Sequence, residues 1–357
     1  MGYTNFDAAI YFTVNDVEKF AQLADPNQEL AFILKHIQLG KVYLETFRSD
    51  HWIDRDKLLH VKEYFIQKNI RTSGGFTTTK AGLGEFKTFC YTNEEDCNLL
   101  RQVVEFTAAF FDEIILDDFF FTNCKCESCI RAKGERSWPQ FRTALLKQVA
   151  EEIVLATAKR VNPNVRVIIK YPNWYEDYQS TGYNLEDESR IFDGIYTGTE
   201  TRDPDTTQQN LQRYQSYFIM RYLESVKPGK NGGGWFDSFD CQYNLNSYAE
   251  QCYLTLFAKA REVTFFCAGL LFRRDRIVVP IAGYVLETAD SFLGELGKPE
   301  GIACYKPFDS HGGSESYIHG FFGMLGLPLE PAPHYPEDRE LILLTKNAGY
   351  DLHLVER

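Results

Sequence analysis

The sequence has no excess of basic residues and no long apolar run, and each absence excludes a class of partner. Its 38 Lys and Arg are outnumbered by 50 Asp and Glu, so the formal net charge is −12, which excludes the basic surface that non-specific nucleic-acid binding needs. No apolar run approaches the roughly 18 residues of a transmembrane helix, so no membrane partner is predicted. The first residues contain no basic or apolar signal segment, which predicts a cytoplasmic protein, or a periplasmic or secreted one if a signal peptide has been removed.

Several catalytic motifs are also missing. No glycine-rich turn follows the first predicted strand and no Walker-type loop is present, which argues against an open nucleotide-binding sheet. The seven His residues form no His-x-His pair, so a hydrolase with a catalytic metal is not expected. A Gly-x-Ser-x-Gly motif, the nucleophile elbow of serine-type hydrolases, is absent as well.

The composition is that of a folded globular protein. The chain has 357 residues, of which 44% are hydrophobic and 25% charged, and this length suits one large α/β domain with a short extension. Aromatic residues make up an unusually high 15%. Large rings build hydrophobic cores, and Tyr and Trp also form flat platforms that suit sugar rings, so composition alone leaves both roles open.

Eight short apolar segments recur along most of the chain, separated by longer intervals, most of which carry an amphipathic helical pattern. Such short runs are typical of parallel strands that are buried on both faces. The predicted strands are 6–12, 41–45, 70–75, 113–117, 165–170, 194–197, 233–236 and 262–268. The clearest predicted helices are 28–39, 54–68, 94–111, 137–161, 207–226 and 245–260. This order predicts an α/β fold, a (β/α)8 TIM barrel, with an open doubly wound sheet as the alternative.

The pattern of apolar segments along the sequence changes near residue 300. Short apolar pieces there are interrupted by Pro and Gly, and the run 341–345 is typical of one more strand. We therefore predict a barrel domain over 1–300 and a C-terminal annex over 301–357. The annex either packs on the barrel or is the first piece of a truncated domain.

Carboxylates and aromatic residues follow most of the predicted strands, at the end where barrel enzymes carry their active sites. Cleavage of an O-glycosidic bond needs one carboxyl group to protonate the leaving oxygen and a second to act as nucleophile or base, without a catalytic cofactor. The candidate catalytic residues are Asp117, Asp118, Glu200 and Asp237. The candidate substrate-binding residues are Glu45, Trp174, Tyr175, Glu176, Arg202 and Trp235. The sequence thus predicts a glycoside hydrolase of carbohydrate metabolism with a carbohydrate substrate; a non-catalytic carbohydrate-binding barrel is the alternative.

Two details of this set are specific enough to be checked. Side chains alternate along a strand, so only one of Asp117 and Asp118 should face inward, and Asp117 shares its face with Ile115. Arg202 is expected to orient the neighbouring Glu200 or to hold a substrate group.

The nine cysteines form no disulfide framework, because their number is odd and no secretory signal is present. Three of them, Cys124, Cys126 and Cys129, lie within six residues directly after the fourth strand. Closely spaced thiolates favour a soft divalent cation, and a fourth thiolate, from Cys90 or alternatively Cys97, would complete a tetrahedral structural zinc site. The remaining cysteines are expected to be buried apolar residues: Cys241, Cys252, Cys267 and Cys304.

The order of a Cys after the third strand, an Asp-bearing fourth strand and then Cys-x-Cys-x2-Cys resembles the barrel domain of glycoside hydrolase family 42 β-galactosidases and related glycosidases. The resemblance implies that Cys90, Cys124, Cys126 and Cys129 hold a structural zinc. It also implies that 305–345 begins an amidotransferase-like domain, cut short here, of a kind often used to form homo-oligomers. Where the family has Asn-Glu after the fourth strand and Glu after the seventh, this chain has Asp117-Asp118 and Asp237, so β-galactosidase specificity does not transfer.

Overall fold

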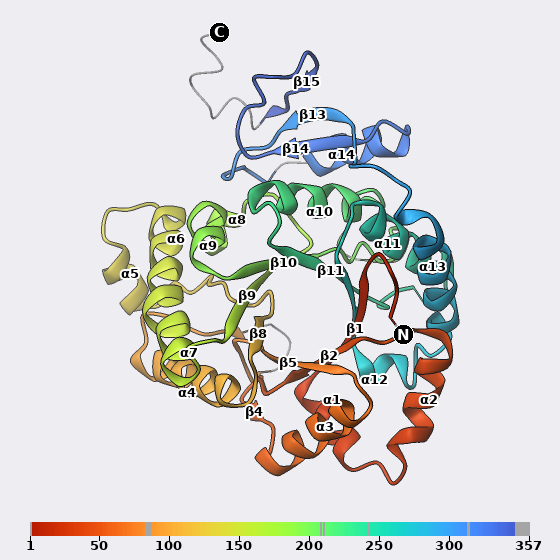
Figure 1. Ribbon diagram of the computed structural model, residues 1–357. Helices are drawn as coiled ribbons and strands as arrows, with labels where there is room; N and C mark the ends of the chain where they lie inside the picture. The colour runs from red at the N-terminus through yellow and green to blue at the C-terminus, as the bar shows by residue number, and fades with distance from the viewer. Residues whose placement is uncertain are drawn as a thin grey trace.

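Eight parallel strands close into a barrel in the computed structural model, which describes residues 2–82, 87–207, 209, 211–241, 243–312 and 315–346 (Figure 1). In order around the barrel the strands are β1 (Asp7–Phe12), β2 (Lys41–Glu45), β5 (Arg71–Phe76), β8 (Glu113–Leu116), β9 (Arg166–Tyr171), β10 (Gly194–Gly198), β11 (Asn231–Asp237) and β12 (Glu262–Phe266). The ring closes where β1 pairs with β12, with Asp7 opposite Glu262. The predicted (β/α)8 barrel is therefore confirmed, and the alternative of an open sheet is wrong.

Helices connect the strands and cover the outside of the barrel, as Figure 1 shows. They are α1 (Val14–Ala21), α2 (Pro26–His36), α3 (Arg55–Gln67), α4 (Glu94–Phe110), α5 (Glu127–Lys133), α6 (Trp138–Val149), a π-helical turn (Ala150–Leu155), α7 (Ala156–Val161), α8 (Tyr178–Thr181), α9 (Leu185–Ile191), α10 (Gln215–Val226), α11 (Leu245–Phe257), α12 (Ala268–Leu271), α13 (Val278–Leu293) and α14 (Glu315–Met324). In the described part of the chain, none of the helices has the length and apolar character needed to cross a membrane.

Side-chain oxygens fix where several of these helices begin. The Thr13 hydroxyl accepts a hydrogen bond from the Asp16 N–H, while the Asp16 carboxylate accepts one from the Thr13 N–H, which forms a capping box for α1. Asp54 accepts from two N–H groups of the first turn of α3 in the same way. Because Thr13 directly follows the last residue of β1, its cap sets the point at which the chain turns back along the barrel.

One predicted helix begins later than expected. The segment predicted as helix from residue 207 becomes helical only at Gln215, the start of α10; residues 208 and 210 lie outside the described residues. Before α10 the chain turns instead, because the Thr207 N–H donates to the Asp203 carbonyl. This turn places Gln209 at the mouth of the barrel, where its side-chain oxygen accepts from Asn173 Nδ2 at 2.8 Å.

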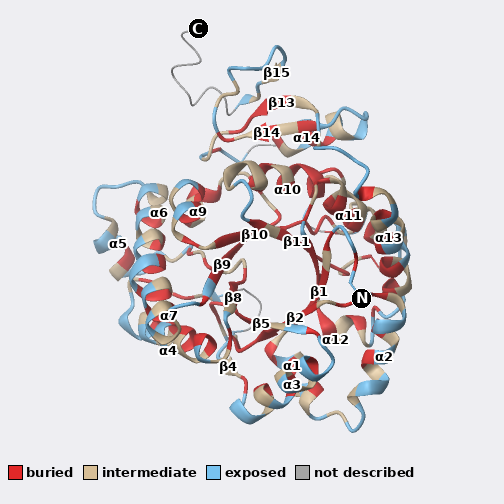
Figure 2. Ribbon diagram, in the orientation of Figure 1, coloured by how far each residue is buried: buried red, intermediate tan, exposed pale blue. Residues whose placement is uncertain are grey.

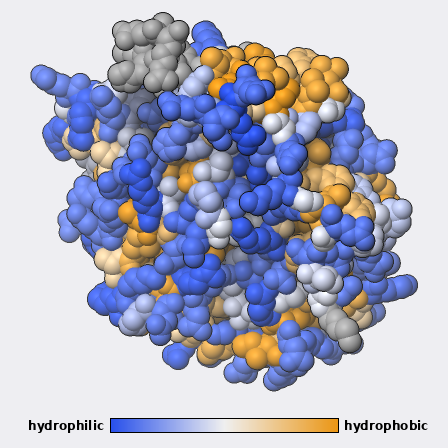
Figure 3. All heavy atoms as spheres, turned by 45° about the horizontal axis from the view of Figure 1, so that its top comes forward, coloured by the Kyte–Doolittle hydropathy of each residue, from blue (hydrophilic) through white to orange (hydrophobic). Residues whose placement is uncertain are grey.

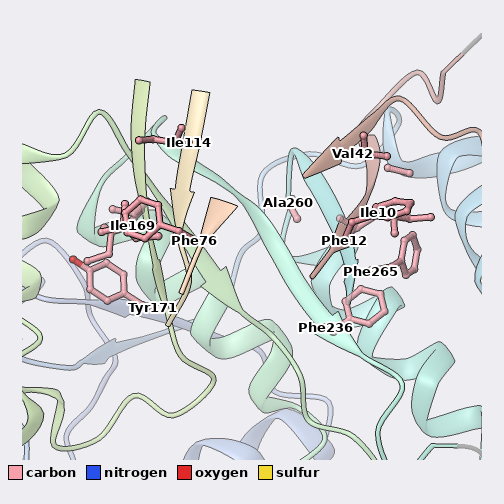
Figure 4. Packing of buried hydrophobic residues seen from close by; sticks show 14 of the residues in the cluster. Ile10, Phe12, Val42, Phe76, Ile114, Ile169, Tyr171, Phe236, Ala260 and Phe265 are labelled. Carbon is pink, nitrogen blue, oxygen red and sulfur yellow. The ribbon is translucent and has the colours of Figure 1, made fainter. Parts of the chain in front are cut away.

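The alternation of side chains along the strands builds two separate cores. Residues such as Ile10, Phe12 and Val42 face outward and pack between the barrel and its helices (Figure 4). The inward-facing residues form a second, mainly aromatic cluster: Ala9, Tyr11, Tyr43, Ile115, Ile168, Tyr196 and Trp235. Figure 2 shows the barrel strands as almost entirely buried, as expected for parallel strands that are covered on both faces.

A three-stranded parallel sheet forms the C-terminal annex, with the order β14 (Leu329–Ala332), β13 (Ile302–Tyr305), β15 (Ile342–Leu343). The strand predicted over 341–345 is therefore present, in a shorter form. The annex packs on α10, where Arg221 and Glu330 form an ion pair at 2.7 Å. Exposed large apolar side chains gather on and after its helix α14: Tyr317, Ile318, Phe321, Met324, Leu325 and Leu327. Orange, hydrophobic residues are concentrated at the upper edge of Figure 3.

Candidate active site

A cavity of about 550 Å³ opens at the carboxyl ends of the barrel strands. Its walls combine four carboxyl groups with six aromatic rings. The lining residues are Arg48, Asp117, Asp118, Phe119, Phe121, Lys170, Asn173, Trp174, Glu200, Arg202, Gln209, Trp235, Asp237, Phe239 and Phe266. All four predicted catalytic residues are brought together here, together with three of the predicted substrate-binding residues, Trp174, Arg202 and Trp235.

Both acids that follow β8 line the cavity, because the expectation of a single inward-facing acid applies only while the strand stays extended. The strand ends at Leu116, and the Phe119 N–H then donates to the Asp117 carbonyl, which forms a turn. Alternation applies only to extended chain, and the turn lets Asp117 and Asp118 face the same space.

Asp117 is held as an ionised group. Its Oδ2 accepts from Arg48 Nη2 at 2.6 Å and from the Thr77 hydroxyl at 3.1 Å, and its Oδ1 accepts from the Asp118 N–H at 2.8 Å. Burial alone would raise the pKa of this carboxyl, but Lys170 and Arg48 hold it below the ordinary value.

Lys170, which the sequence analysis did not single out, lies at the centre of the site. It is on β9, with its side chain only 2% exposed, and its Nζ lies 2.5 Å from Asp118 Oδ2, 3.5 Å from Glu200 Oε1 and 3.6 Å from Asp117 Oδ1. Burial opposes a charged lysine, but the three carboxylates raise its pKa and keep it charged. Because the first two distances share Nζ, the oxygens of Asp118 and Glu200 are at most about 6.0 Å apart.

Asp118 and Glu200 retain protons more readily than ordinary acids. Burial is the main cause for both: against the effect of Lys170, it raises the pKa of Asp118 to about 7, and it also raises the pKa of Glu200. Glu200 Oε2 is buried and has no hydrogen-bond partner among the described residues. Gly198 makes room for it, since a Cβ there would lie 2.9 Å from Glu200 Oε2 and 2.8 Å from the Asn173 nitrogen.

Asp237, at the end of β11, is bound by Arg202 rather than free. Arg202 Nε lies 3.0 Å from Oδ1 and Nη2 lies 2.8 Å from Oδ2, a bidentate contact, and the Phe239 N–H also donates to Oδ1. Burial nevertheless raises the pKa of Asp237. Arg202 adopts a left-handed backbone conformation (φ 59°), and its guanidinium contacts Asp237; its charge also acts on Glu200, whose pKa it lowers against the effect of burial.

Three of the predicted substrate-binding residues do not reach the cavity, which corrects the predicted set. Glu45 is fully buried, and its carboxylate accepts hydrogen bonds from Tyr11, the Val14 N–H and Arg48, so it helps to hold the Arg48 side chain. Tyr175 and Glu176 are turned toward the annex, where each makes a hydrogen bond.

The four predicted metal ligands do come together. The Sγ atoms of Cys90, Cys124, Cys126 and Cys129 all lie within 4.8 Å of one another, and Cys90 Sγ is 3.7 Å from Cys126 Sγ and 3.6 Å from Cys129 Sγ. Tetrahedral zinc with Zn–S bonds of about 2.3 Å needs sulfurs about 3.8 Å apart. Cys97 instead contacts the Tyr91 carbonyl, so it is not the fourth ligand. This group can hold a metal ion.

The other cysteines follow the prediction. Cys241, Cys252, Cys267 and Cys304 are buried free thiols.

Comparison with known proteins relates the chain to glycoside hydrolases. A family model described as "Uncharacterized protein SSO3021, second domain" matches residues 297–357. The curated protein of that name from Saccharolobus solfataricus is 26% identical over 393 residues, which cover 98% of this chain and 64% of the relative, so the chain spans less than two thirds of that protein's length.

Solved structures share the fold at low sequence identity. A GH5_18 variant from Streptomyces cattleya, in complex with Manb1-4GlcNAc, matches with a TM-score of 0.59 and 12% identity over 99% of this chain and 97% of its own. The endo-1,4-beta-mannanase from Rhizomucor miehei matches with a TM-score of 0.52 and 12% identity over 83% of this chain and 96% of its own. These matches do not single out family 42. A second family model, described as "Probable glycosyl hydrolase, catalytic domain", matches residues 1–279, which is most of the chain; the chain therefore belongs to this family of probable glycosyl hydrolases.

Proposed function

We propose that the protein hydrolyses an O-glycosidic bond, with Asp118 and Glu200 as the reacting pair. The observation that carries this proposal is that Lys170 Nζ contacts both carboxyl groups, which limits the separation of Asp118 Oδ2 and Glu200 Oε1 to at most about 6.0 Å. Glycosidases that retain the anomeric configuration place their carboxyl groups about 5–5.5 Å apart, and inverting ones about 6.5–9.5 Å. A separation of at most about 6.0 Å between these two oxygens is compatible with the retaining, two-step reaction, which we adopt. A carbohydrate-binding barrel would have no need for such a pair in an open cavity.

The charge balance supports different roles for the two acids. The surrounding carboxylates outnumber the cations, so the pair keeps one proton at neutral pH, as the raised pKa of each carboxyl indicates. We assign this proton to Glu200, because its Oε2 has no other hydrogen-bond partner among the described residues. Asp118 accepts from the Lys170 ammonium at 2.5 Å and is the carboxylate.

The reaction then proceeds in two balanced steps. Glu200 gives its proton to the leaving oxygen as the C–O bond breaks, and Asp118 forms a bond to the anomeric carbon. In the second step Glu200 takes a proton from water, whose oxygen displaces Asp118 and restores both groups. Lys170 moderates the charge on Asp118 throughout, while the ionised Asp117 holds Arg48 and Lys170 in place.

The cavity walls suit a neutral sugar. Trp174 is a partly exposed ring in the cavity wall, whereas Trp235 is buried beneath Lys170, and each cation that lines the cavity is already paired with a carboxylate. A carboxylated or sulfated sugar would find no unpaired cation among these lining residues, and it would face a surplus of acids.

The cysteine group is assigned a structural role. Four thiolates leave no open coordination position, so a zinc ion there would fix the segment after Asp118 without taking part in catalysis. The sequence-based expectations of a homo-oligomer and of a truncated amidotransferase-like domain remain predictions.

The proposal is tested with aryl glycosides whose leaving groups differ in acidity. The unmodified protein should cleave 4-nitrophenyl members of a broad panel. Glu200→Gln should lose about 10²–10⁴ in kcat/KM on these substrates and much less on a 2,4-dinitrophenyl glycoside, which departs without protonation. Asp118→Asn should lose activity on both. A panel without any cleavage, while sugars still bind, would reject hydrolysis in favour of simple carbohydrate binding.

A further inference from the structure

The loop after β9 first lines the cavity and then contacts the annex. Asn173 and Trp174 line the cavity. Tyr175, the following residue, is only 2% exposed, and its hydroxyl makes a 2.8 Å hydrogen bond with Nδ1 of His319 on α14. Adjacent residues of one short loop thus connect the site to the C-terminal sheet.

The contacts of the next residues lead to the annex as well. Glu176 Oε1 accepts from the Ser316 N–H at 2.7 Å. The Asp177 N–H donates to the Ser310 hydroxyl at 3.3 Å, and Gln179 Nε2 donates to the Ser310 carbonyl at 2.6 Å. Each residue from 175 to 177 therefore contacts the C-terminal segment, so the loop is held at several successive points.

His319 is itself fixed on all sides. Its ring stacks on Phe218 of α10, with centroids 4.1 Å apart and an interplanar angle of 13°, and its Nε2 lies 3.4 Å from the Sγ of Cys304 on β13. Burial and the charge of Lys306 lower the pKa of His319 to about 3. The ring is therefore neutral at physiological pH, with one donor and one acceptor nitrogen, and each nitrogen has a partner.

We propose that the annex is part of the substrate-binding machinery: through the Tyr175–His319 contact it fixes the loop that presents Trp174 to the cavity. Tyr175 and His319 are positioning residues, and the proposal rests on the function of Trp174 as a sugar-stacking wall in the proposed glycosidase. A platform that is already ordered before the sugar arrives avoids the entropy cost of ordering the loop upon binding. The annex would accordingly affect substrate affinity more than the chemical step.

The test removes single hydroxyl groups from the full chain. Tyr175→Phe keeps the ring but loses the bond to His319. A matched control is Tyr214→Phe, since the Tyr214 hydroxyl also joins barrel and annex, by accepting from the Leu329 N–H at 3.0 Å, at a place away from the loop. Tyr175→Phe should speed amide hydrogen exchange in peptides covering 172–182 and raise KM about three- to tenfold, with kcat within about twofold; the control should do neither. Ser310→Ala gives a second test of the same loop if Tyr175→Phe does not fold.

A double-mutant cycle connects the effect to Trp174. Trp174→Ala should raise KM, and adding Tyr175→Phe should raise it no further, because Tyr175 acts through Trp174. Unchanged exchange in the loop, an equal effect of Tyr214→Phe, or fully additive KM changes would overturn the proposal. Hydrogen exchange can be measured without any catalytic turnover. If Tyr175→Phe speeds exchange but the protein cleaves no glycoside, the proposed reaction is rejected and the positioning role is kept. If the protein cleaves glycosides but exchange is unchanged, the positioning role is rejected and the reaction is kept.

Discussion

The two ends of the barrel each bury a lysine among carboxylates, but their charge balance differs. At the base, Lys41 Nζ lies 2.5 Å from Glu113 Oε1 and 3.3 Å from Glu262 Oε2, and Arg166 lies 3.1 Å from Glu113. Two cations thus face two carboxylates. Burial alone would raise the pKa of Glu113, but Lys41 holds it below the ordinary value. The base is a compensated ion-pair network with a structural role.

At the mouth, three cations face five carboxylates. The cations are Arg48, Lys170 and Arg202, and the carboxylates are Glu45, Asp117, Asp118, Glu200 and Asp237. Here burial prevails over the cations at Asp118, whose pKa rises to about 7, and at Glu200. The comparison teaches that the surplus of acid, rather than the presence of buried charges, distinguishes the reactive end from the structural one.

The largest expected effect comes from removing one acid at each end. Asp118→Asn should lower kcat/KM by about 10³-fold or more, because the nucleophile is lost. Glu113→Gln should leave kcat/KM within about twofold but lower the free energy of unfolding by about 1–3 kcal/mol, since Lys41 loses a buried partner. Glycoside hydrolysis and urea denaturation measure the two quantities. If Glu113→Gln costs as much activity as Asp118→Asn, the division between the ends is wrong.

The fold could be predicted from the sequence because the patterns that indicate strands and helices lie within short stretches of the chain. Runs such as 165–170 are short and apolar, and each predicted strand coincides with an observed one to within a few residues. The grouping of Cys90 with the later cysteines also followed from its place after the third strand.

The candidate active site could be predicted only in part, because its geometry depends on turns and on contacts between segments that are distant in the sequence. The turn after Leu116 brings both following acids into the cavity, and Glu45 is withdrawn by donors from other segments of the chain. A lysine within an apolar strand, such as Lys170, indicates a buried charge that needs carboxylate partners. In this protein those partners are two of the candidate catalytic residues, Asp118 and Glu200.

The pH dependence sharpens the comparison, because the pKa values of Asp118 and Glu200 at the mouth are raised while that of Glu113 at the base is lowered. The raised pKa values of Asp118 and Glu200 mean that the folded state binds the one proton of this pair more tightly than the unfolded chain does. The pair therefore makes the free energy of unfolding fall as pH rises from about 4 to about 7. The lowered pKa of Glu113 stabilises the fold at neutral pH, and this stabilisation is lost on acidification.

Denaturation at pH 5, 6 and 7 tests this directly. Glu200→Gln should reduce the loss of stability between pH 5 and 7, by an amount on the order of 1 kcal/mol, and Glu113→Gln should be most destabilised, relative to the unmodified protein, at pH 7. The kcat/KM of the unmodified protein should decline above about pH 7 as the pair loses its proton. An unchanged pH slope in Glu200→Gln would contradict a proton held at the mouth.

The smallest effect on activity is expected at the cysteine group, a third charged cluster that lies outside the cavity. There a metal ion would compensate the thiolates, as the cations do at the base, so its loss should affect stability far more than chemistry. Metal analysis should find about one zinc per chain. Cys126→Ser should release it and lower Tm by several degrees, with kcat/KM reduced less than about tenfold. Cys97→Ser, a nearby thiol outside the group, should keep the metal. Metal-free protein whose Tm is insensitive to chelators would show that the four thiols need no ion, and that only the barrel base is a compensated network.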